Sequence, residues 1–261
     1  MKLISFLSDF GSNSSYISQM KGAALSITDA KIIDITHDIR PHDIKEGAFV
    51  LRSSVPYFPR GSVHVAVVDP GVGTDRRGIV ITTPSQILVG PDNGLLIPVA
   101  RFLGNFTVYK IENTKLMMPF VSNTFHGRDI FSPVAAHILN GLLFEQIGPI
   151  ISDFVDFSFE DFEIKNSSAV GKIIHIDSFG NIITNIDGMK FHNQLDFEKK
   201  VTFFIGKKTY KALFVKTYNF VKKGDTLLTI GSSNFLEISI NQDNAAKKLG
   251  ANTDDDIKIL F

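Results

Sequence analysis

The hydrophobic pattern of the chain changes once, near residue 160, and this change limits the folds that the chain can adopt. Before that point, apolar runs typical of buried strands alternate with amphipathic segments of helical period. After about residue 168 the chain has only short β-rich runs, separated by turns rich in Gly, Asn and Lys. The 261 residues are enough for two modules of this kind. We therefore expect two domains, over residues 1–160 and 168–261.

The first module has the pattern of an α/β domain. We expect strands at residues 3–7, 31–35, 62–68, 78–82, 86–89 and 107–111, and helices at 14–27, 43–54 and from just after Gly127. Strands that alternate with helices predict a mostly parallel central sheet. Ligands of such sheets bind beside the carboxyl ends of the strands, so polar residues at those ends are the first candidates for a site.

The second module has the pattern of a smaller all-β domain. We expect strands at residues 170–177, 201–205, 209–214, 226–230, 236–240 and 257–260. Short strands joined by tight turns are typical of an antiparallel barrel or sandwich, and we expect the barrel.

Charge and cysteine content argue against several classes of partner. Lysine plus arginine is 27 and aspartate plus glutamate is 27, so no overall field attracts the chain to nucleic acid or anionic lipid. Residues 199–223 carry eight lysines among aromatic residues, a pattern that either a single-strand nucleic-acid groove or the solvated face of a barrel explains. The alternation favours the barrel face. The chain has no cysteine, no signal peptide and no long apolar run, so we expect a cytoplasmic protein that binds neither nucleic acid nor membrane.

The motifs of several common enzyme classes are missing. The sequence has no HExxH, no GxxxxGK[ST] and no GxSxG, and VDPGVG does not match GxGxxG. The sequence therefore lacks the motif that would best support a zinc hydrolase, a P-loop ATPase, a serine hydrolase or a Rossmann dehydrogenase.

Polar residues do follow the strands of the first module. Asp69 ends a buried-type strand, and Arg76 follows seven residues later across a Pro-Gly turn that can return its guanidinium to the carboxylate. Asp9, after the first strand, could bridge a ribose diol or cap the next turn. His126 directly precedes a helix, whose positive end favours a neutral imidazole that can accept a proton. The Asn93-Gly94 pair needs no explanation beyond a turn.

Two segments of the second module hold further candidates. Residues 176–186 place Asp177, Phe179, Asn181 and Asn185 in a turn between strands. Phe179 could stack on a planar base and Asn181 offers both a donor and an acceptor, although a plain hairpin explains them equally. Residues 231–245 add Ser232, Ser233 and Glu237.

Taken in order, six segments resemble the S-adenosylmethionine hydrolases, or hydroxide adenosyltransferases, which are relatives of the fluorinase and chlorinase. These segments are SDFG, VVDPGVGTDRR, GPDNGLL, TFHGRDIFSP, IDSFGNIITNI and SSNFLEISIN, within residues 3–245. The resemblance implies an α/β domain followed by a β-barrel, a homotrimer with active sites between neighbouring subunits, and no metal or other cofactor. The implied reaction is S-adenosylmethionine plus water giving adenosine and L-methionine.

The resemblance also implies roles for individual residues. Asp69, Arg76 and His126 match the water-handling set of the family, and Asp9 matches its ribose-binding aspartate. The residues that match positions at the adenine and methionine ends are Asp177, Phe179, Asn181, Ser232 and Glu237, with Ser233 as the alternative to Ser232. Whether Asp69 or His126 takes the proton of the water stays open.

Two other functions remain as alternatives. One is a halide-dependent adenosyltransferase, and the other is a protein that binds S-adenosylmethionine or adenosine without turnover. The fluorinase lacks the aspartate, arginine and histidine of the water-handling set and has its halide-binding serine where this chain has Gly127. We therefore expect water as the nucleophile.

Overall fold

The computed structural model describes residues 2–261, which form two compact units. The first unit ends at Phe157 and the second spans Ser158–Phe261. Within the described residues, every helix is too short or too polar to cross a bilayer.

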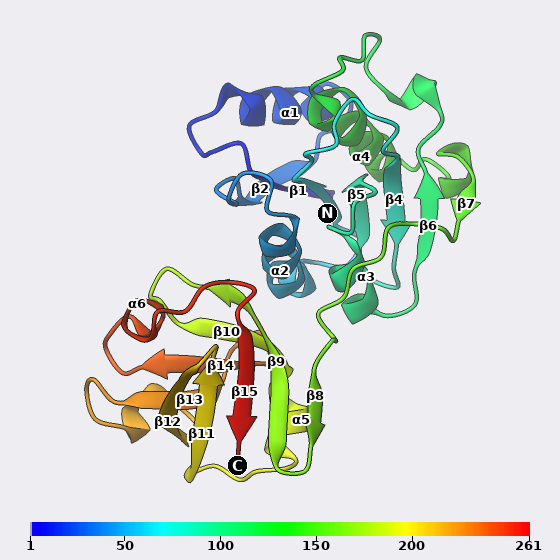
Figure 1. The fold of residues 1–261 in the computed structure, drawn as a ribbon. Coiled ribbons are helices and arrows are strands. Elements are labelled where there is room, and N and C mark those ends of the chain that lie inside the picture. Colours follow the sequence, from blue (N-terminus) through cyan, green and yellow to red (C-terminus); the bar gives the residue numbers. More distant parts are fainter. Residues whose placement is uncertain (1) are drawn as a thin grey trace. The chain divides into compact units, whose positions relative to one another are not determined.

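The first unit is built on a seven-stranded sheet (Figure 1). Its strands are β1 (Leu3–Ser8), β2 (Lys31–Thr36), β3 (Val63–Val67), β4 (Gly78–Thr82), β5 (Ile87–Pro91), β6 (Thr107–Lys110) and β7 (Ile150–Ile151), in the order β2-β1-β3-β5-β4-β6-β7. The expected parallel pairing is confirmed for β2, β1, β3 and β5, and the remaining pairs are antiparallel. The link between β4 and β5 is too short for a helical crossover, so these two strands pair antiparallel.

Four helices cover this sheet. They are α1 (Ser15–Leu25), α2 (Ile44–Ser54), α3 (Ile97–Leu103) and α4 (Ser132–Leu139). Figure 1 shows α1 and α4 on one side of the sheet and α2 and α3 on the other. The side chains of Ser14 and Asp43 accept hydrogen bonds from the first turns of α1 and α2, which fixes where both helices begin. Met20 of α1 and Val134 of α4 lie in the core with the side chains of β1 and β3.

The second unit is a closed barrel with one added strand. Its strands are β8 (Glu163–Lys165), β9 (Ser168–Ile176), β10 (Ile182–Asp187), β11 (Lys199–Ile205), β12 (Lys208–Phe214), β13 (Thr226–Ile230), β14 (Phe235–Ile240) and β15 (Asp256–Leu260). Because β10 pairs with both β9 and β14, the seven strands β9 to β15 form a ring, and β8 joins the outside of β9. Among the described strands of the ring, β12 and β13 are the one parallel pair.

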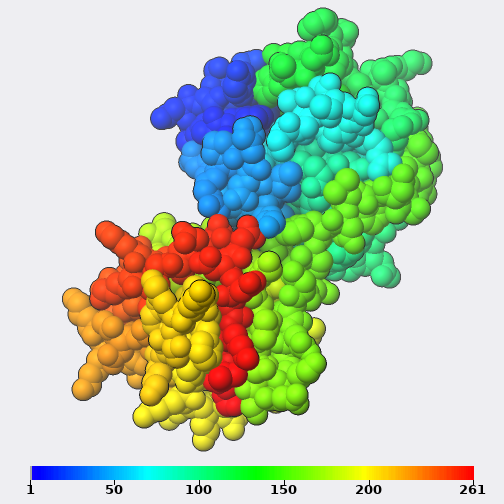
Figure 2. Space-filling model, viewed as in Figure 1, coloured from blue at the N-terminus to red at the C-terminus, as the bar shows by residue number. Residues whose placement is uncertain are grey.

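The barrel agrees with the expected all-β domain, with two short helices added. These are α5 (Gly188–His192) and α6 (Ala245–Leu249). Figure 2 shows β15, in red, on the surface of this unit between the yellow β11–β12 hairpin and the green β9. Buried side chains alternate with half-buried or exposed ones along β11 and β12, and the lysines of both strands are exposed, so the pattern in residues 199–214 is that of a barrel wall with one solvated face.

Candidate active site

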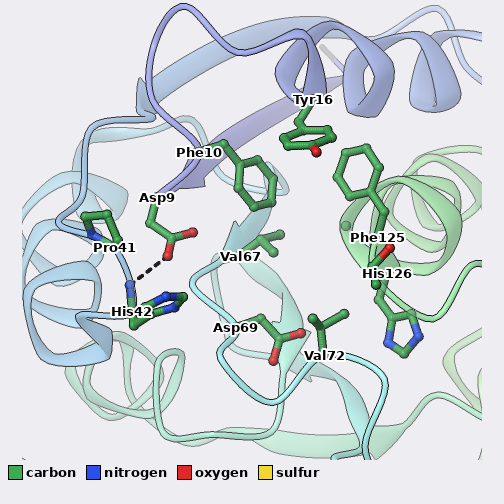
Figure 3. A pocket seen from close by; sticks show the side chains of 12 residues that line it. Asp9, Phe10, Tyr16, Pro41, His42, Val67, Asp69, Val72, Phe125 and His126 are labelled. Atoms are coloured by element: carbon green, nitrogen blue, oxygen red, sulfur yellow. Dashed lines mark hydrogen bonds between the residues drawn. The ribbon is translucent and has the colours of Figure 1, made fainter.

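The carboxyl ends of β1 and β3 open into a cavity of about 330 Å³ in the first unit (Figure 3). These strands are parallel neighbours, and Ser8 lies beside Val67 in their register. Asp9 and Asp69, which follow these strands, are therefore brought to one edge of the sheet, and both line the cavity. His126 reaches the same cavity from the loop before α4.

Asp69, Arg76 and His126 are in direct contact. The Arg76 guanidinium donates to both carboxylate oxygens of Asp69, from Nε to Oδ1 at 3.1 Å and from Nη2 to Oδ2 at 2.7 Å. Arg76 Nη2 also lies 3.0 Å from Nδ1 of His126. The Asp69 and Arg76 side chains are only 5% and 8% exposed, so this is a buried two-point ion pair with an imidazole at its edge.

The electrostatic surroundings favour a neutral His126. Burial and then the nearby Arg76 charge lower the pKa of His126 below its usual 6.5. A guanidinium can only donate, so Nδ1 accepts from Arg76 and the ring proton sits on Nε2. Burial raises the pKa of the Asp69 carboxyl above its usual value, although the charge and hydrogen bonds of Arg76 oppose this shift.

A close approach between two loops brings these residues together. Gly73 has a φ angle of 77°, and a Cβ added there would collide with the backbone carbonyl of Asn123. Only glycine combines this backbone with this contact. The Gly73 contact therefore packs the loop that carries Asp69 and Arg76 against the loop that carries His126.

The helix expected after Gly127 begins differently from a regular α-helix. Residues Gly127–Phe131 form a π-helical turn, and α4 continues from Ser132. The Gly127 carbonyl accepts from the backbone N–H of Ser132 and, at 2.7 Å, from its hydroxyl. Turns of this type often occur at functional sites, and this one directly follows His126.

Asp9 does not cap the turn that follows it. Its Oδ2 accepts a hydrogen bond of 2.8 Å from the backbone N–H of His42, and its other oxygen faces the cavity (Figure 3). Three aromatic rings form another part of the lining, with centroid distances of 5.0 to 5.7 Å among Phe10, Tyr16 and Phe125. Sequence reasoning missed His42, Phe10 and Tyr16 as cavity residues, because nothing in the local pattern of an aromatic residue separates a cavity wall from a core.

The GPDNGLL segment supports the site from outside the cavity. Asn93 Nδ2 donates to the carbonyl of Val68, directly before Asp69, at 2.8 Å. Asp92 accepts from Arg77 Nε and from the Val155 backbone, each at 2.8 Å. These contacts agree with the prediction that the segment is a structural turn.

In the second unit, Asp177 organises the turn between β9 and β10. Its Oδ1 accepts from the backbone N–H groups of Phe179 and Asn181, and its Oδ2 accepts from Asn181 Nδ2, each at 2.9 Å. The Phe179 ring is left 77% exposed. Phe179 and Asn181 line a cavity of about 520 Å³, which Tyr218 also lines.

The placement of Asn185 in the same turn was wrong. Asn185 is a fully buried residue of β10. It accepts from the Lys172 backbone at 2.7 Å and donates to Asp161 at 2.9 Å, so its polar groups serve the barrel itself.

Glu237 lies in β14 and is 6% exposed. Its Oε1 accepts from the hydroxyls of Tyr218 and Ser239, each at 2.7 Å. Burial and then the hydrogen bond to Glu237 raise the pKa of Tyr218. Ser232 is exposed on the turn after β13, and neither it, Glu237 nor Asp177 lines the cavity of Tyr218. Tyr218, which links Glu237 to that cavity, was not singled out by sequence reasoning.

The described residues contain no group of three or more His, Asp or Glu side chains placed to hold a metal ion.

An α/β unit with an Asp–Arg–His cluster at its strand ends, followed by a seven-stranded barrel, defines the class of protein. The family model described as SAM hydroxide adenosyltransferase N-terminal domain matches residues 4–148, and the model of the C-terminal domain matches residues 171–258. The chain therefore belongs to the SAM hydroxide adenosyltransferase family.

Individual relatives agree with this membership. The chain is 42% identical to the (R)-S-adenosyl-L-methionine hydrolase of Methanocaldococcus jannaschii, over 100% of this chain and 97% of the relative. It is 29% identical to a fluorinase of Nocardia brasiliensis, over 70% of this chain and 71% of the relative. Among solved structures, an uncharacterized conserved protein from Thermotoga maritima superimposes with a TM-score of 0.94 and 37% identity, covering 99% of this chain and 100% of that chain.

Proposed function

We propose that this protein hydrolyses S-adenosyl-L-methionine to adenosine and L-methionine, with Asp69, Arg76 and His126 handling the attacking water. Full-length relatives at 30% to 42% identity carry the name (R)-S-adenosyl-L-methionine hydrolase. The single observation that carries the assignment of residues is the buried contact of Asp69, Arg76 and His126 beside a cavity that Asp9 also lines.

The reaction needs no general acid, because the leaving group is neutral. The water oxygen forms a bond to C5′ of the ribose while the bond from C5′ to sulfur breaks, and the sulfur leaves with the electron pair as a neutral thioether. The site must therefore hold a water in line with the breaking bond and remove one proton from it. Water and the sulfonium balance the reaction, so we propose that no cofactor takes part.

The hydrogen-bond directions suggest which residue takes the proton. Nδ1 of His126 already accepts from Arg76, and Nε2 carries the ring proton. His126 can then donate to the water but has no free acceptor, whereas Asp69 has a carboxylate whose pKa is raised by burial. We assign proton acceptance to Asp69 and orientation of the water to His126, while Arg76 stabilises the charge that develops on the oxygen.

Substrate placement follows from the rest of the cavity. Asp9 can accept from the ribose diol, and we propose that C5′ then faces Asp69 and His126, which line the same cavity. The rings of Phe10, Tyr16 and Phe125 offer an aromatic wall to the sulfonium cation. Asp177, Phe179, Asn181, Ser232 and Glu237 would meet the adenine and methionine ends from a neighbouring subunit of a homotrimer. The trimer, like the cytoplasmic location, stays a prediction.

Product analysis tests this function. The protein is incubated with each sulfonium epimer of S-adenosylmethionine, with and without chloride, and the products are separated by chromatography. We expect equal amounts of adenosine and methionine that do not depend on chloride, and no turnover by Arg76→Ala. A halogenated adenosine would favour the halide-dependent transferase. Tight binding of either epimer without release of methionine would favour a binding protein.

A further inference from the structure

Asp129 is a buried carboxylate that does not line the cavity of the candidate site. It belongs to the π-helical turn after His126 and is only 1% exposed. Its carboxylate pairs with the guanidinium of the preceding residue, Arg128, from Nε to Oδ1 at 2.6 Å and from Nη2 to Oδ2 at 3.0 Å. An ion pair between neighbours in the chain fixes no distant segment, so this pair alone does not explain why the carboxylate is buried.

Asp129 holds the loop before His126 at three points. Its Oδ2 accepts from the backbone N–H of Ser122 at 2.9 Å. Its backbone carbonyl accepts from the N–H of Met118 at 2.8 Å, and its own N–H donates to the carbonyl of Phe125 at 3.1 Å. The loop is therefore fastened to a single residue, and only the contact with Ser122 depends on the side chain of that residue.

The contact with Ser122 lies where this loop packs against the loop that carries Arg76. Ser122 directly precedes Asn123, whose carbonyl is the atom that a Cβ at Gly73 would strike. The Asp129 carboxylate therefore fixes the backbone of one loop beside the point at which the two loops meet.

Arg128 extends the attachment to helix α1. Its Nη1 donates to Oε1 of Gln19 at 2.9 Å, and its guanidinium lies 5.0 Å from the centroid of the Phe125 ring. The Arg128 side chain is 30% exposed, so water can solvate the guanidinium if the carboxylate is removed. The carboxylate and its partner thus connect the loop to a helix of the core.

We propose that Asp129 is a positioning residue, whose carboxylate holds the loop before His126 so that the imidazole stays within hydrogen-bond distance of Arg76. This inference rests on the proposed function. Because Asp129 does not line the cavity, we expect it to act through His126 and not on the substrate. A displacement of about 1 Å at a reacting centre can lower a rate about a hundredfold.

Two substitutions of Asp129 separate the loop contact from the charge. Asp129→Ala removes the acceptor of the Ser122 N–H, whereas Asp129→Asn keeps an oxygen that can accept it and loses the ion pair with Arg128. We expect the kcat of Asp129→Ala to fall about a hundredfold. Asp129→Asn should keep most of its kcat. In both variants KM and the Kd for adenosine, measured by calorimetry, should change much less than the kcat of Asp129→Ala.

Val63→Ala is the control for lost stability. Val63 is fully buried at the end of β3 that lies opposite the cavity. Its truncation should lower the thermal midpoint, because buried methyl groups are lost, and leave kcat unchanged well below that midpoint. If Asp129→Ala does not fold, Ser122→Pro removes the donor from the loop side and leaves the pair of Asp129 with Arg128 in place.

A double-mutant cycle tests whether Asp129 acts through His126. Once the imidazole is removed its placement no longer matters, so Asp129→Ala should change kcat/KM by only about twofold in a His126→Ala background. Crystal structures give a readout that needs no turnover. The distance from Arg76 Nη2 to His126 Nδ1, 3.0 Å in the wild type, should exceed about 3.5 Å in Asp129→Ala and be kept in Asp129→Asn.

Equal losses of kcat in Asp129→Ala and Asp129→Asn would overturn the inference, because the charge and not the loop contact would then matter. A full loss from Asp129→Ala in the His126→Ala background would also overturn it, as would an unchanged distance between Arg76 and His126. These results would leave the hydrolase function intact. A wild type without turnover would remove the proposed function, while the crystal structures would still show whether Asp129 positions His126.

Discussion

At the scale of single residues, the buried charges of the site neutralise one another. The Asp69 carboxylate receives two hydrogen bonds from Arg76, and His126 completes the cluster as a neutral ring. A buried ion pair of this kind adds little net stability, while removal of one partner costs about 3–5 kcal/mol because the other charge is left unpaired. The arrangement is therefore better explained by chemistry than by stability.

The protonation of His126 predicts how activity depends on pH. A proton added to Nδ1 would take the place of the Arg76 hydrogen bond and put two cations side by side. Since the pKa of His126 is lowered below 6.5, the neutral form dominates at and above that pH. We expect kcat/KM to be level from neutral pH upward and to fall as the pH drops through the pKa of His126. Protonation of Asp69 would also lower kcat/KM as the pH falls.

His126→Gln tests this assignment, because its amide can donate where Nε2 donates but does not titrate. The acid limb of the kcat/KM profile should move to lower pH in this variant, with part of the activity kept. Activity that instead rises on acidification in the wild type would mean that the protonated ring is the working form.

At the scale of elements, the loop contact at Gly73 should control both stability and activity. Gly73→Ala places a Cβ against the Asn123 carbonyl and strains a φ of 77°. We expect a loss of more than about 2 kcal/mol in the free energy of unfolding, since the strain of a left-handed alanine alone costs about 1–2 kcal/mol. The kcat value should fall as well, because the loops of Arg76 and His126 separate.

Gly61→Ala controls for strain alone, since its φ is 79° and no atom lies near the added Cβ. Urea unfolding and steady-state kinetics are measured on both variants. If Gly73→Ala loses no more kcat than Gly61→Ala, the contact between the two loops does not position the site.

The regular elements were largely predictable because their hydrophobic periods are clear. The strands that precede Asp9 and Asp69 and the helices capped by Ser14 and Asp43 fall within a few residues of the expected ranges. The helix α3 was not predicted, because Ile97–Ala100 is buried on all sides and has no amphipathic period.

The site was predictable to a smaller extent. The pairing of Asp69 with Arg76 could be predicted, because the two residues are only seven positions apart and a Pro-Gly turn lies between them. His126 is 50 residues from Arg76, and only the family resemblance associated the two. The π-helical turn after His126 and the contacts of Asp129 with the preceding loop depend on backbone hydrogen bonds that no hydrophobic period encodes.

At the scale of the whole molecule, the predicted homotrimer places the two halves of each active site on different chains. Arg76→Ala and Asn181→Ala homotrimers would then both be inactive, each lacking one half. Random mixing of the two chains creates some sites with both halves intact. We expect co-expressed variants to show activity well above that of either parent. Mixed trimers no more active than the parents, with subunit exchange verified by mass spectrometry, would place each site within one chain.

The central claim, that water held by Asp69, Arg76 and His126 attacks C5′, is tested most directly by running the reaction in ¹⁸O-labelled water. We predict that the adenosine product carries one labelled oxygen at its 5′ position, that methionine carries none, and that Arg76→Ala forms neither product. Unlabelled adenosine, or label in methionine, would contradict attack by water at C5′.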